Sequence, residues 1–206
     1  MRLSHTAHTS QSWRIHELAN DFHVEDVWAL PWVGGPDDFP RLVELVASFD
    51  PSRSSSVVRV LVGLRRKLGD LLGWDGPQAG LGSRVPTLRE RLPADLLDGP
   101  CGPSSSVLPF TSLYLTEEEW AAEVANQTVH GVLHIGRIPV GEGRYRAQMA
   151  ILVKPNGLLG TAYMAAIRPF RYLIVYPAIL GEVERKWRAA SDLSPWCRPS
   201  AEMRSG

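Results

Sequence analysis

The fold is decided by residues 158–187, which read LLGTAYMAAIRPFRYLIVYPAILGEVERKW. Apolar side chains recur in this stretch at i, i+4, i+7 and i+11, the spacing of one face of an α-helix: Tyr163, Ile167, Phe170 and Ile174. Pro169 and Pro177 lie inside the same stretch, and each removes a backbone hydrogen-bond donor. The pattern therefore predicts a long C-terminal helix that kinks or splits at the prolines.

A membrane-spanning helix is the alternative for so apolar a stretch. Arg168, Arg171 and the two prolines would fall inside the span, where charged side chains are costly. The residues therefore favour a helix that packs on a β-sheet, in a protein without a membrane span. Beyond Trp187 the tail contains Pro195 and Pro199, and we expect it to be loose.

In the residues before this helix, apolar and polar side chains alternate as they do in β-strands. One strand is predicted over Ala125–Ile138 and a second over 144–153, with Gly141-Glu142-Gly143 as the loop between them. A register with His134 opposite Gln148 puts the apolar residues of both strands on one face. The other face then carries a polar set: Asn126, Thr128, His130, His134, Arg146 and Gln148.

The first half of the chain predicts shorter elements. A strand, two helices, a helical turn and a further strand are expected at 24–32, 37–50, 54–71, 88–92 and 108–115. Stretches rich in Gly and Pro, at 74–82 and 86–103, indicate loops. The run Glu117-Glu118-Glu119 after Thr116 fits either a short capped helix or an acidic turn between strands.

This order of elements is typical of an α+β fold, in which a curved antiparallel β-sheet packs on a long kinked C-terminal helix, with two helices after the first strand. The length of 206 residues suits a single domain, 1–206, with a folded core over about 24–188. The N-terminal dozen residues and the C-terminal tail are expected to be loose. The layout resembles the helix-grip (SRPBCC-like) fold of START-type and pollen-allergen-like proteins, which implies a hydrophobic cavity between sheet and helix.

Composition argues against several classes of protein. The 22 basic and 22 acidic residues give no net charge, so the chain lacks the basic surface that gathers nucleic acid or anionic lipid. Its two cysteines, Cys101 and Cys197, form no CxxC pair, and neither a disulfide framework nor a metal site is expected. The first twelve residues lack the apolar region of a signal peptide, so a cytoplasmic location is expected.

Known catalytic and cofactor motifs are absent from the sequence. It has no GxSxG, Walker or HExxH motif, and its glycine pairs lack the strand-then-helix setting of a dinucleotide site. No cofactor is therefore expected. His130 and His134 have the spacing of a helical metal pair, but on a strand they would lie roughly 13 Å apart, too far for one ion.

The polar sheet face supplies most candidate site residues. If it lines a pocket, His130, His134 and Glu123 are candidate acids or bases, although polar residues on a partly wet sheet are the simpler interpretation. Arg168 and Arg171 are three residues apart, which suits either a carboxylate or phosphate grip or two side chains that reach to solvent. The predicted ligand-binding set is Trp28, Asn126, His130, His134, Gln148, Tyr163 and Arg168.

The C-terminal third carries a family resemblance. The runs VKPNGLLG at 153–160, IRPFR at 167–171 and LIVYP at 173–177, with Tyr163-Met164 between them, resemble the end of DUF2867, a bacterial family of unknown function. NQTVH at 126–130 and residues 65–74 are also similar to that family, so the resemblance covers about 24–187. Many members have His where this chain has Arg171, and some are fused to a short-chain-dehydrogenase-like domain. The resemblance implies no known activity.

Three functions stay open at this point. The first is a module that binds a small hydrophobic or amphipathic molecule between sheet and helix, and the second is a cyclase- or isomerase-type enzyme that uses the same cavity. The third is an interaction module for a separate NAD(P)-binding oxidoreductase, by analogy with the fused relatives. A homodimer is also left open. We take the binding module as the prediction, and the sequence does not identify the ligand.

Overall fold

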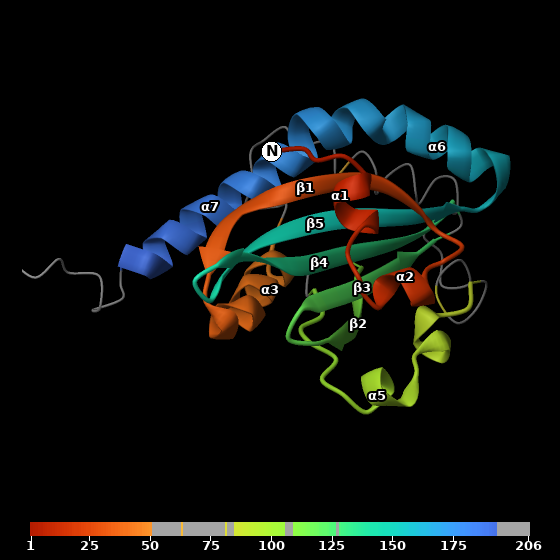
Figure 1. Ribbon diagram of the computed structural model, residues 1–206. Helices are drawn as coiled ribbons and strands as arrows, with labels where there is room; N and C mark the ends of the chain where they lie inside the picture. Colours follow the sequence, from red (N-terminus) through yellow and green to blue (C-terminus); the bar gives the residue numbers. More distant parts are fainter. Residues whose placement is uncertain (51–62, 64–80, 82–84, 106–108, 127, 193–206) are drawn as a thin grey trace, which may run out of the picture.

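A five-stranded antiparallel β-sheet forms the centre of the molecule, with strand order β1-β5-β4-β3-β2 (Figure 1). The computed structural model describes residues 1–50, 63, 81, 85–105, 109–126 and 128–192. The strands are β1 (His23–Gly34), β2 (Thr111–Leu115), β3 (Glu119–Ala125), β4 (Val129–Gly141) and β5 (Arg144–Pro155). The α+β class and the antiparallel sheet predicted from the sequence are confirmed.

Helices lie on both sides of this sheet. The shorter ones are α1 (Thr6–Thr9), α2 (Ile15–Leu18), η1 (Pro36–Asp38), α3 (Phe39–Ala47), η3 (Leu88–Arg91) and α5 (Ala94–Leu97). The long C-terminal helix consists of α6 (Gly157–Phe170), the π-helical turn η4 (Arg171–Val175) and α7 (Tyr176–Asp192). The second helix expected at 54–71, the loop at 74–82 and the tail beyond 192 lie outside the described residues, apart from Gly63 and Leu81.

The hairpin of β4 and β5 follows the prediction with a shifted register. His134 lies opposite Ala150, and Gly136 lies opposite Gln148, so the register differs by two residues from the expected one. A shift of two residues leaves every side chain on its face, because side chains alternate with period two. Gly141, Glu142 and Gly143 all have positive φ, which closes the hairpin where the loop was expected.

β3 was not recognised as a strand in the sequence. Its residues, EWAAEVA, are rich in Ala and Glu, which favour helices. Thr116 Oγ1 accepts hydrogen bonds from the backbone N–H groups of Glu118 and Glu119, at 3.2 and 3.1 Å, so the acidic run forms the turn between β2 and β3. The strand expected over Ala125–Ile138 begins at Val129, after a turn in which Asn126 Oδ1 accepts from the Thr128 and Val129 N–H groups.

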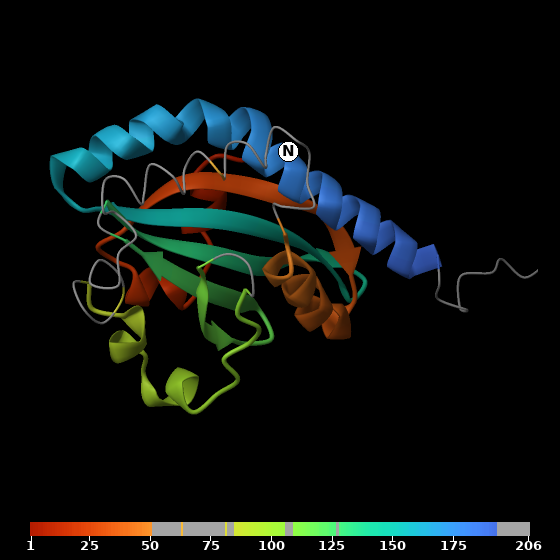
Figure 2. The same ribbon diagram turned by 180° about the vertical axis from the view of Figure 1, so that it is seen from behind.

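The C-terminal helix is continuous from Gly157 to Asp192 and bends in the middle (Figure 2). Pro169 lies near the end of α6 and Pro177 near the start of α7, with the π-helical turn between them. A π turn takes up an extra residue and is a recognised cause of helix bending. The predicted kink is therefore present, spread over η4. None of the described helices has the length and apolarity that a bilayer crossing requires.

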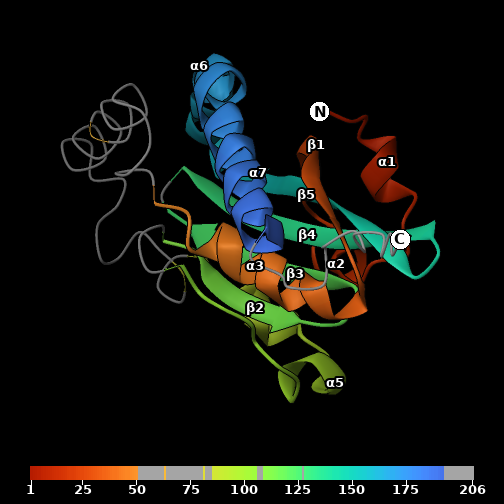
Figure 3. The same ribbon diagram turned by 90° about the vertical axis from the view of Figure 1, so that its left-hand side faces the viewer.

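Each face of the sheet packs against its own layer (Figure 3). One face packs against α3 and the long helix, and its buried residues include Leu30, Trp32, Phe39, Leu42, Trp120, Ile135, Met149, Tyr176 and Val183. The opposite face packs against the N-terminal segment and the region around η3 and α5, and its buried residues include Trp13, Ile15, Leu18, Val27, Leu88, Leu96, Tyr114 and Val132. Of the predicted polar sheet face, Thr128, His130, His134 and Gln148 are buried under this layer, and Arg146 is exposed.

The N-terminal residues, expected to be loose, are part of this second layer. Leu3 N–H donates to the Val27 carbonyl at 2.9 Å, and Ala29 N–H donates to the Met1 carbonyl at 2.8 Å, so the first residues pair with the edge of β1. Trp13 is buried against Gly136, at a place where a Cβ atom would collide with the indole ring. The prediction missed residues 1–12 because they carry few apolar side chains, and Met1, Leu3 and His8 are held by hydrogen bonds to distant residues.

Substitutions at two glycines of the long helix test how closely the helix packs on the sheet. A Cβ atom on Gly160 would overlap the Thr128 carbonyl oxygen, whereas a Cβ atom on Gly181 would meet nothing within 4 Å. Gly160→Ala is expected to lower the free energy of unfolding by about 2 kcal/mol, since α6 must move away from the sheet. Gly181→Ala is expected to raise it by about 0.5–1 kcal/mol, because alanine is the better helix former. Denaturant unfolding measures both, and equal effects would contradict this docking.

Candidate functional site: a buried carboxylate at the helix bend

Asp26 is a fully buried carboxylate that faces the bend of the C-terminal helix. A β-bulge between Val24 and Asp26 shifts the register of β1 against β5 and places Asp26 opposite Ile151, on the helix side of the sheet. Bulges commonly re-aim side chains near functional sites. The bulge therefore brings an acidic side chain into the layer between the sheet and the helix.

The helix bend supplies the partners of this carboxylate. The Tyr172 hydroxyl donates to Asp26 Oδ1, and the Tyr176 hydroxyl donates to Oδ2, the latter at 2.5 Å. Arg171 Nη2 forms an ion pair with Glu25 Oε1 at 2.6 Å, and Nη1 lies 3.3 Å from Asp26 Oδ2. The π-helical turn thus fixes the middle of the long helix to the bulged end of β1. We call Glu25, Asp26, Trp28, Arg171, Tyr172 and Tyr176 the bend cluster.

Charges in the bend cluster support one another. Burial alone would raise the pKa of Glu25, but the hydrogen bond and charge of Arg171 outweigh it and hold that pKa below its usual range. Burial likewise opposes the charge of Arg171, and Glu25 outweighs it, so the pKa of the guanidinium is raised. Burial, reinforced by Asp26, raises the pKa of Tyr172 and Tyr176. Both tyrosines therefore stay protonated at neutral pH and act as donors.

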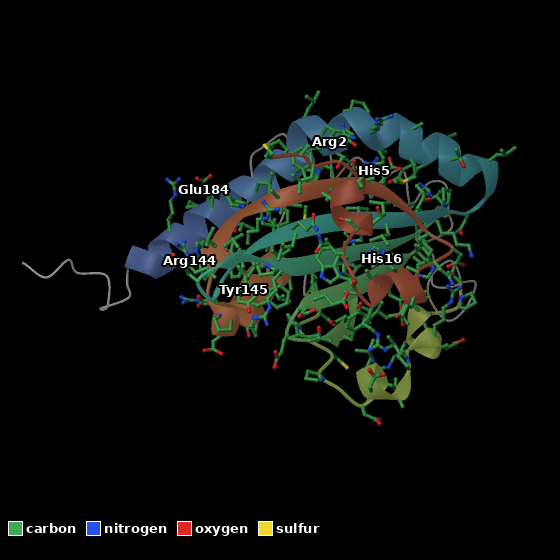
Figure 4. All side chains as sticks on the ribbon, in the orientation of Figure 1. Arg2, His5, His16, Arg144, Tyr145 and Glu184 are labelled. Carbon is green, nitrogen blue, oxygen red and sulfur yellow. The ribbon has the colours of Figure 1, made fainter. Side chains whose placement is uncertain are left out.

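Several donors of the bend cluster have no hydrogen-bond partner among the described residues. They are the buried indole N–H of Trp28 and the buried Nε and Nη1 groups of Arg171, although Nη1 is within ion-pair distance of Asp26. The Trp28 and Tyr172 side chains are half-buried, and their ring centroids lie 6.1 Å apart. Arg2 covers the Tyr172 ring at 4.5 Å, and Figure 4 shows this residue beside the long helix. The cluster therefore combines unused donors with partly exposed aromatic surface.

The histidines predicted for the site lie on the opposite face of the sheet and pair with glutamates. His134 Nε2 lies 3.0 Å from Glu119 Oε2, and His130 Nε2 lies 2.9 Å from Glu123 Oε2. All four side chains are at most 4% exposed. Because each ring is buried against a carboxylate, the candidate acids and bases His130, His134 and Glu123 form two internal pairs rather than one open site.

The first of these pairs extends into the N-terminal segment. His8 Nε2 lies 3.0 Å from His134 Nδ1, and Glu119 also accepts from the Arg14 N–H at 2.6 Å and from the Tyr114 hydroxyl at 3.1 Å. A Glu119 carboxylate requires the His134 proton on Nε2, so Nδ1 accepts and His8 donates. Gln148 Nε2 donates to the Ala7 carbonyl at 3.0 Å. These polar contacts anchor the N-terminal segment to the sheet.

The seven predicted ligand-binding residues do not form one site. Trp28 belongs to the bend cluster, Tyr163 is half-buried on α6, and Arg168 is exposed with its guanidinium 5.8 Å from the Tyr172 ring. The others lie elsewhere: His130, His134 and Gln148 under the N-terminal segment, and Asn126 in the turn before β4. Arg171 pairs with Glu25 and Asp26, whereas Arg168 is exposed, so the two arginines do not form one grip.

Nothing in the residue pattern singles out Asp26, Tyr172 and Tyr176 as a unit. The bulge that turns Asp26 toward the helix has no local signature in the strand, and the π-helical turn changes the helical spacing on which face assignments rely. A surface pocket of about 380 Å³, lined by Pro40, Leu96, Pro100 and neighbouring residues, lies away from the bend cluster.

One family model matches residues 18–178, and its description is "Protein of unknown function (DUF2867)". The chain belongs to the DUF2867 family. The match contains the sheet, the bend cluster and α6. Neither a curated protein nor a solved structure matches the chain, so the resemblance to START-type proteins remains one of layout.

His8 and His134, which we call the histidine network, are expected to make the stability of the protein depend on pH. Burial, together with the charges of His134 and His16, lowers the pKa of His8 to about 2, and burial also lowers the pKa of His134. Both stay neutral in the folded protein, while in the unfolded chain they take up protons below about pH 6.5. The contribution of these two histidines to the free energy of unfolding is therefore fully present above that pH. Below it, the free energy of unfolding falls by up to about 1.4 kcal/mol per pH unit for each histidine.

Denaturant unfolding between about pH 6.5 and pH 5.5 measures this slope, above the range in which the glutamates of the unfolded chain take up protons. The slope reports the number of protons taken up on unfolding, and His8→Gln is expected to lower that number by up to one, whatever its effect on the free energy of unfolding at pH 7. The matched control is His5→Gln, because His5 is exposed, and it is expected to keep the slope of the unchanged protein. A His8→Gln protein with an undiminished slope would show that His8 is not held neutral.

Proposed function

We propose that this DUF2867 chain binds a small hydrophobic or amphipathic molecule between the sheet and the C-terminal helix, at the bend cluster. The observation that carries the proposal is the buried Trp28 N–H, which has no partner among the described residues and lies beside half-buried aromatic surface. A buried donor without a partner costs roughly 1–3 kcal/mol. A bound molecule that offers an acceptor oxygen recovers that cost.

The charges of the bend cluster favour a ligand with a neutral polar group. Glu25 and Asp26 carry two negative charges, while Arg171 and the nearby Arg2 carry two positive ones. An anionic head group would gain little from an arginine whose charge is already neutralised by two carboxylates. Trp28 and Tyr172 offer aromatic surface for an apolar body. A carbonyl or hydroxyl compound with an apolar body therefore suits the cluster best.

The helix bend is consistent with a functional role. Single π turns are rare inside α-helices and are frequent at functional sites. In this chain the turn at Arg171–Val175 places Arg171 and Tyr172 against the same end of β1. A straight helix would bury its polar residues less favourably there, so the turn supports the choice of this region over the rest of the interface.

An enzyme of the cyclase or isomerase type remains the alternative use of the same space. Its acid or base would be the Tyr172–Asp26 pair, since the Tyr172 side chain is half-buried and its hydroxyl bonds to the carboxylate. His130 and His134 are poor candidates for this role because both are enclosed with their glutamates. Conversion of a retained molecule by purified protein would favour the enzyme, and unchanged release would favour the binding module.

Ligand retention and one matched pair of variants test the proposal. The protein is purified from its own host and examined by native mass spectrometry for a retained molecule. Binding is then measured with prodan, a neutral naphthalene ketone whose fluorescence reports an apolar environment. Trp28→Phe keeps the ring but removes the donor, so we expect its affinity for prodan to fall about tenfold.

Trp32→Phe is the matched control. Its indole N–H is also buried without a partner among the described residues, but it lies at the other end of β1, near Trp187. We expect this variant to bind prodan as tightly as the unchanged protein. The proposal fails if prodan shows no saturable binding and no molecule is retained, or if the two variants bind equally well.

A further inference from the structure

Residues 1–12, which we call the strap, pass the edge of β1 and contact both faces of the sheet (Figure 3). Arg2 forms an antiparallel bridge with Trp28. Residues opposite each other in such a pair have their side chains on the same side of the sheet. Arg2 therefore lies on the helix side, where its guanidinium is 4.5 Å from the Tyr172 ring centroid. Leu3 points to the other side and packs with the layer that covers the opposite face, so the strap connects the bend cluster to that layer.

His8 is the only fully buried side chain of the strap. Its Nε2 atom donates to His134 Nδ1 at 3.0 Å. The neighbouring Ala7 carbonyl accepts from Gln148 Nε2, also at 3.0 Å. The buried core of the N-terminal segment begins after the strap, at Trp13. Segments with few buried apolar contacts open locally without unfolding of the whole protein. The strap can therefore detach by giving up one buried imidazole and a few hydrogen bonds.

The closed strap does not accommodate a proton on His8. The Nδ1 atom of His8 is buried without a partner among the described residues, and Nε2 already directs its proton to His134. A charged His8 would be desolvated there without an acceptor, whereas in a detached strap it is hydrated, so burial lowers the pKa of His8. Glu119 does not neutralise this charge, because it already accepts from His134. The ionisable or polar groups that face His8 directly or through His134 are His16 on α2 with the preceding Arg14, Tyr114 on β2, Glu119 on β3, His134 on β4 and the uncharged Gln148 on β5.

The strap borders the bend cluster and is held there more weakly than the long helix. The Trp28 N–H is buried, so a ligand reaches it only after a neighbouring element has moved. The long helix is fixed at this place by the Tyr176 hydroxyl and the Arg171 guanidinium, which both contact the buried Asp26 carboxylate. The strap contributes the exposed Arg2 side chain and its backbone pairing with β1. Movement of the strap therefore breaks fewer buried contacts than movement of the helix.

We propose that the strap is a lid over the bend cluster, held closed by the neutral pair of His8 and His134, which we call the latch, and released when His8 takes up a proton. The proposal rests on the proposed function, because it assigns the regulation of that same ligand site. Release removes Arg2 from the Tyr172 ring and frees the edge of β1 beside Trp28. In mild acid the bend cluster then exchanges its neutral, largely apolar ligand rapidly, whereas at neutral pH the exchange is slow.

The expected size of the effect follows from the two states of His8. In a detached strap His8 takes up a proton below about pH 6.5, whereas in the closed strap it stays neutral. Between about pH 6.5 and pH 5.5, each proton taken up on release raises the ratio of released to closed strap by up to tenfold per pH unit. His134 loses its contact with His8 at the same time and adds up to one further proton. The rate of ligand entry follows the released fraction.

Hydrogen exchange of the full chain tests the latch without any ligand. The Ala29 N–H donates to the Met1 carbonyl at 2.8 Å, so its protection reports whether the strap is in place. After correction for intrinsic exchange, we expect this protection to fall about tenfold more than that of central β5 amides between about pH 6.5 and pH 5.5. His8→Gln should diminish the fall, and His5→Gln, at an exposed position, should leave it unchanged. Ala29 protection that does not fall, or that falls equally in His8→Gln, overturns the latch.

Stopped-flow binding of prodan tests the lid. We expect association with the unchanged protein to accelerate about tenfold from about pH 6.5 to pH 5.5, and the His8→Gln protein to lose most of that acceleration. His5→Gln should keep it. His23→Gln should keep it as well, although His23 lies 3.3 Å from Glu25 of the bend cluster. Acceleration that survives His8→Gln, or that His23→Gln removes, overturns the lid.

A permanent charge at position 8 gives the converse test. His8→Arg carries its charge at every pH, so we expect its strap to be released at about pH 7.5. Prodan should then associate with this variant at about the rate that the unchanged protein reaches at pH 5.5. Association of His8→Arg at the slow rate of the unchanged protein at pH 7.5 overturns the lid. Prodan that binds at no pH overturns the ligand site and the lid together, whereas the Ala29 exchange still decides whether the latch exists.

Discussion

The sheet is covered on both faces, and this constraint governs which polar residues the strands can carry. One side packs on the long helix and the other on the N-terminal segment. Water is excluded from the middle of both faces, so a polar side chain buried there loses free energy unless it finds a partner within the protein. Glu119, Glu123 and Asp26 meet this requirement in different ways: the first two with histidines, and the third with two tyrosines and an arginine.

The two faces use their polar groups for different purposes. On the N-terminal side the two glutamates are satisfied, because each meets a histidine and its remaining capacity goes to backbone N–H groups and hydroxyls, and the atoms left over there are the acceptors His8 Nδ1 and Gln148 Oε1. On the helix side donors are left over at Trp28 and Arg171. Closed pairs fix a segment in place, whereas leftover donors cost free energy unless something else binds them. The helix side therefore offers unused donors beside half-buried aromatic rings, whereas the N-terminal side offers two unused acceptors within an enclosed layer.

Sequence patterns identified the elements whose periodicity is regular. The β4–β5 hairpin and the bent helix follow from alternation, a Gly-rich loop and two prolines. β3 was missed because alanine and glutamate have little preference for strands, and its pairing with β4 outweighs their local preference. The N-terminal segment was missed because His8 is held by His134, a residue 126 positions away. Local pattern cannot show such a contact.

Site prediction was limited by a different factor. Alternation correctly separated the apolar from the polar side of the hairpin, but it does not tell what covers each side. His130 and His134 were therefore grouped with Trp28, although the sheet itself lies between them. Asp26 could be placed with Tyr172 only once the bulge and the π-helical turn were known. Both are local departures from regular strand and helix geometry, and the spacing of apolar residues in the sequence does not indicate them.

The position of Trp13 has an optical consequence. Its indole ring lies 4.8 Å from the His134 ring and 5.0 Å from the His8 ring, on the opposite side of the sheet from Trp28 and Trp32. Both imidazoles are neutral in the folded protein, and an imidazole that takes up a proton quenches indole emission at such range, so opening of the N-terminal layer in mild acid would dim Trp13. A protein in which Trp13 alone is replaced by phenylalanine would lose this acid-dependent part of the emission, without any attached dye.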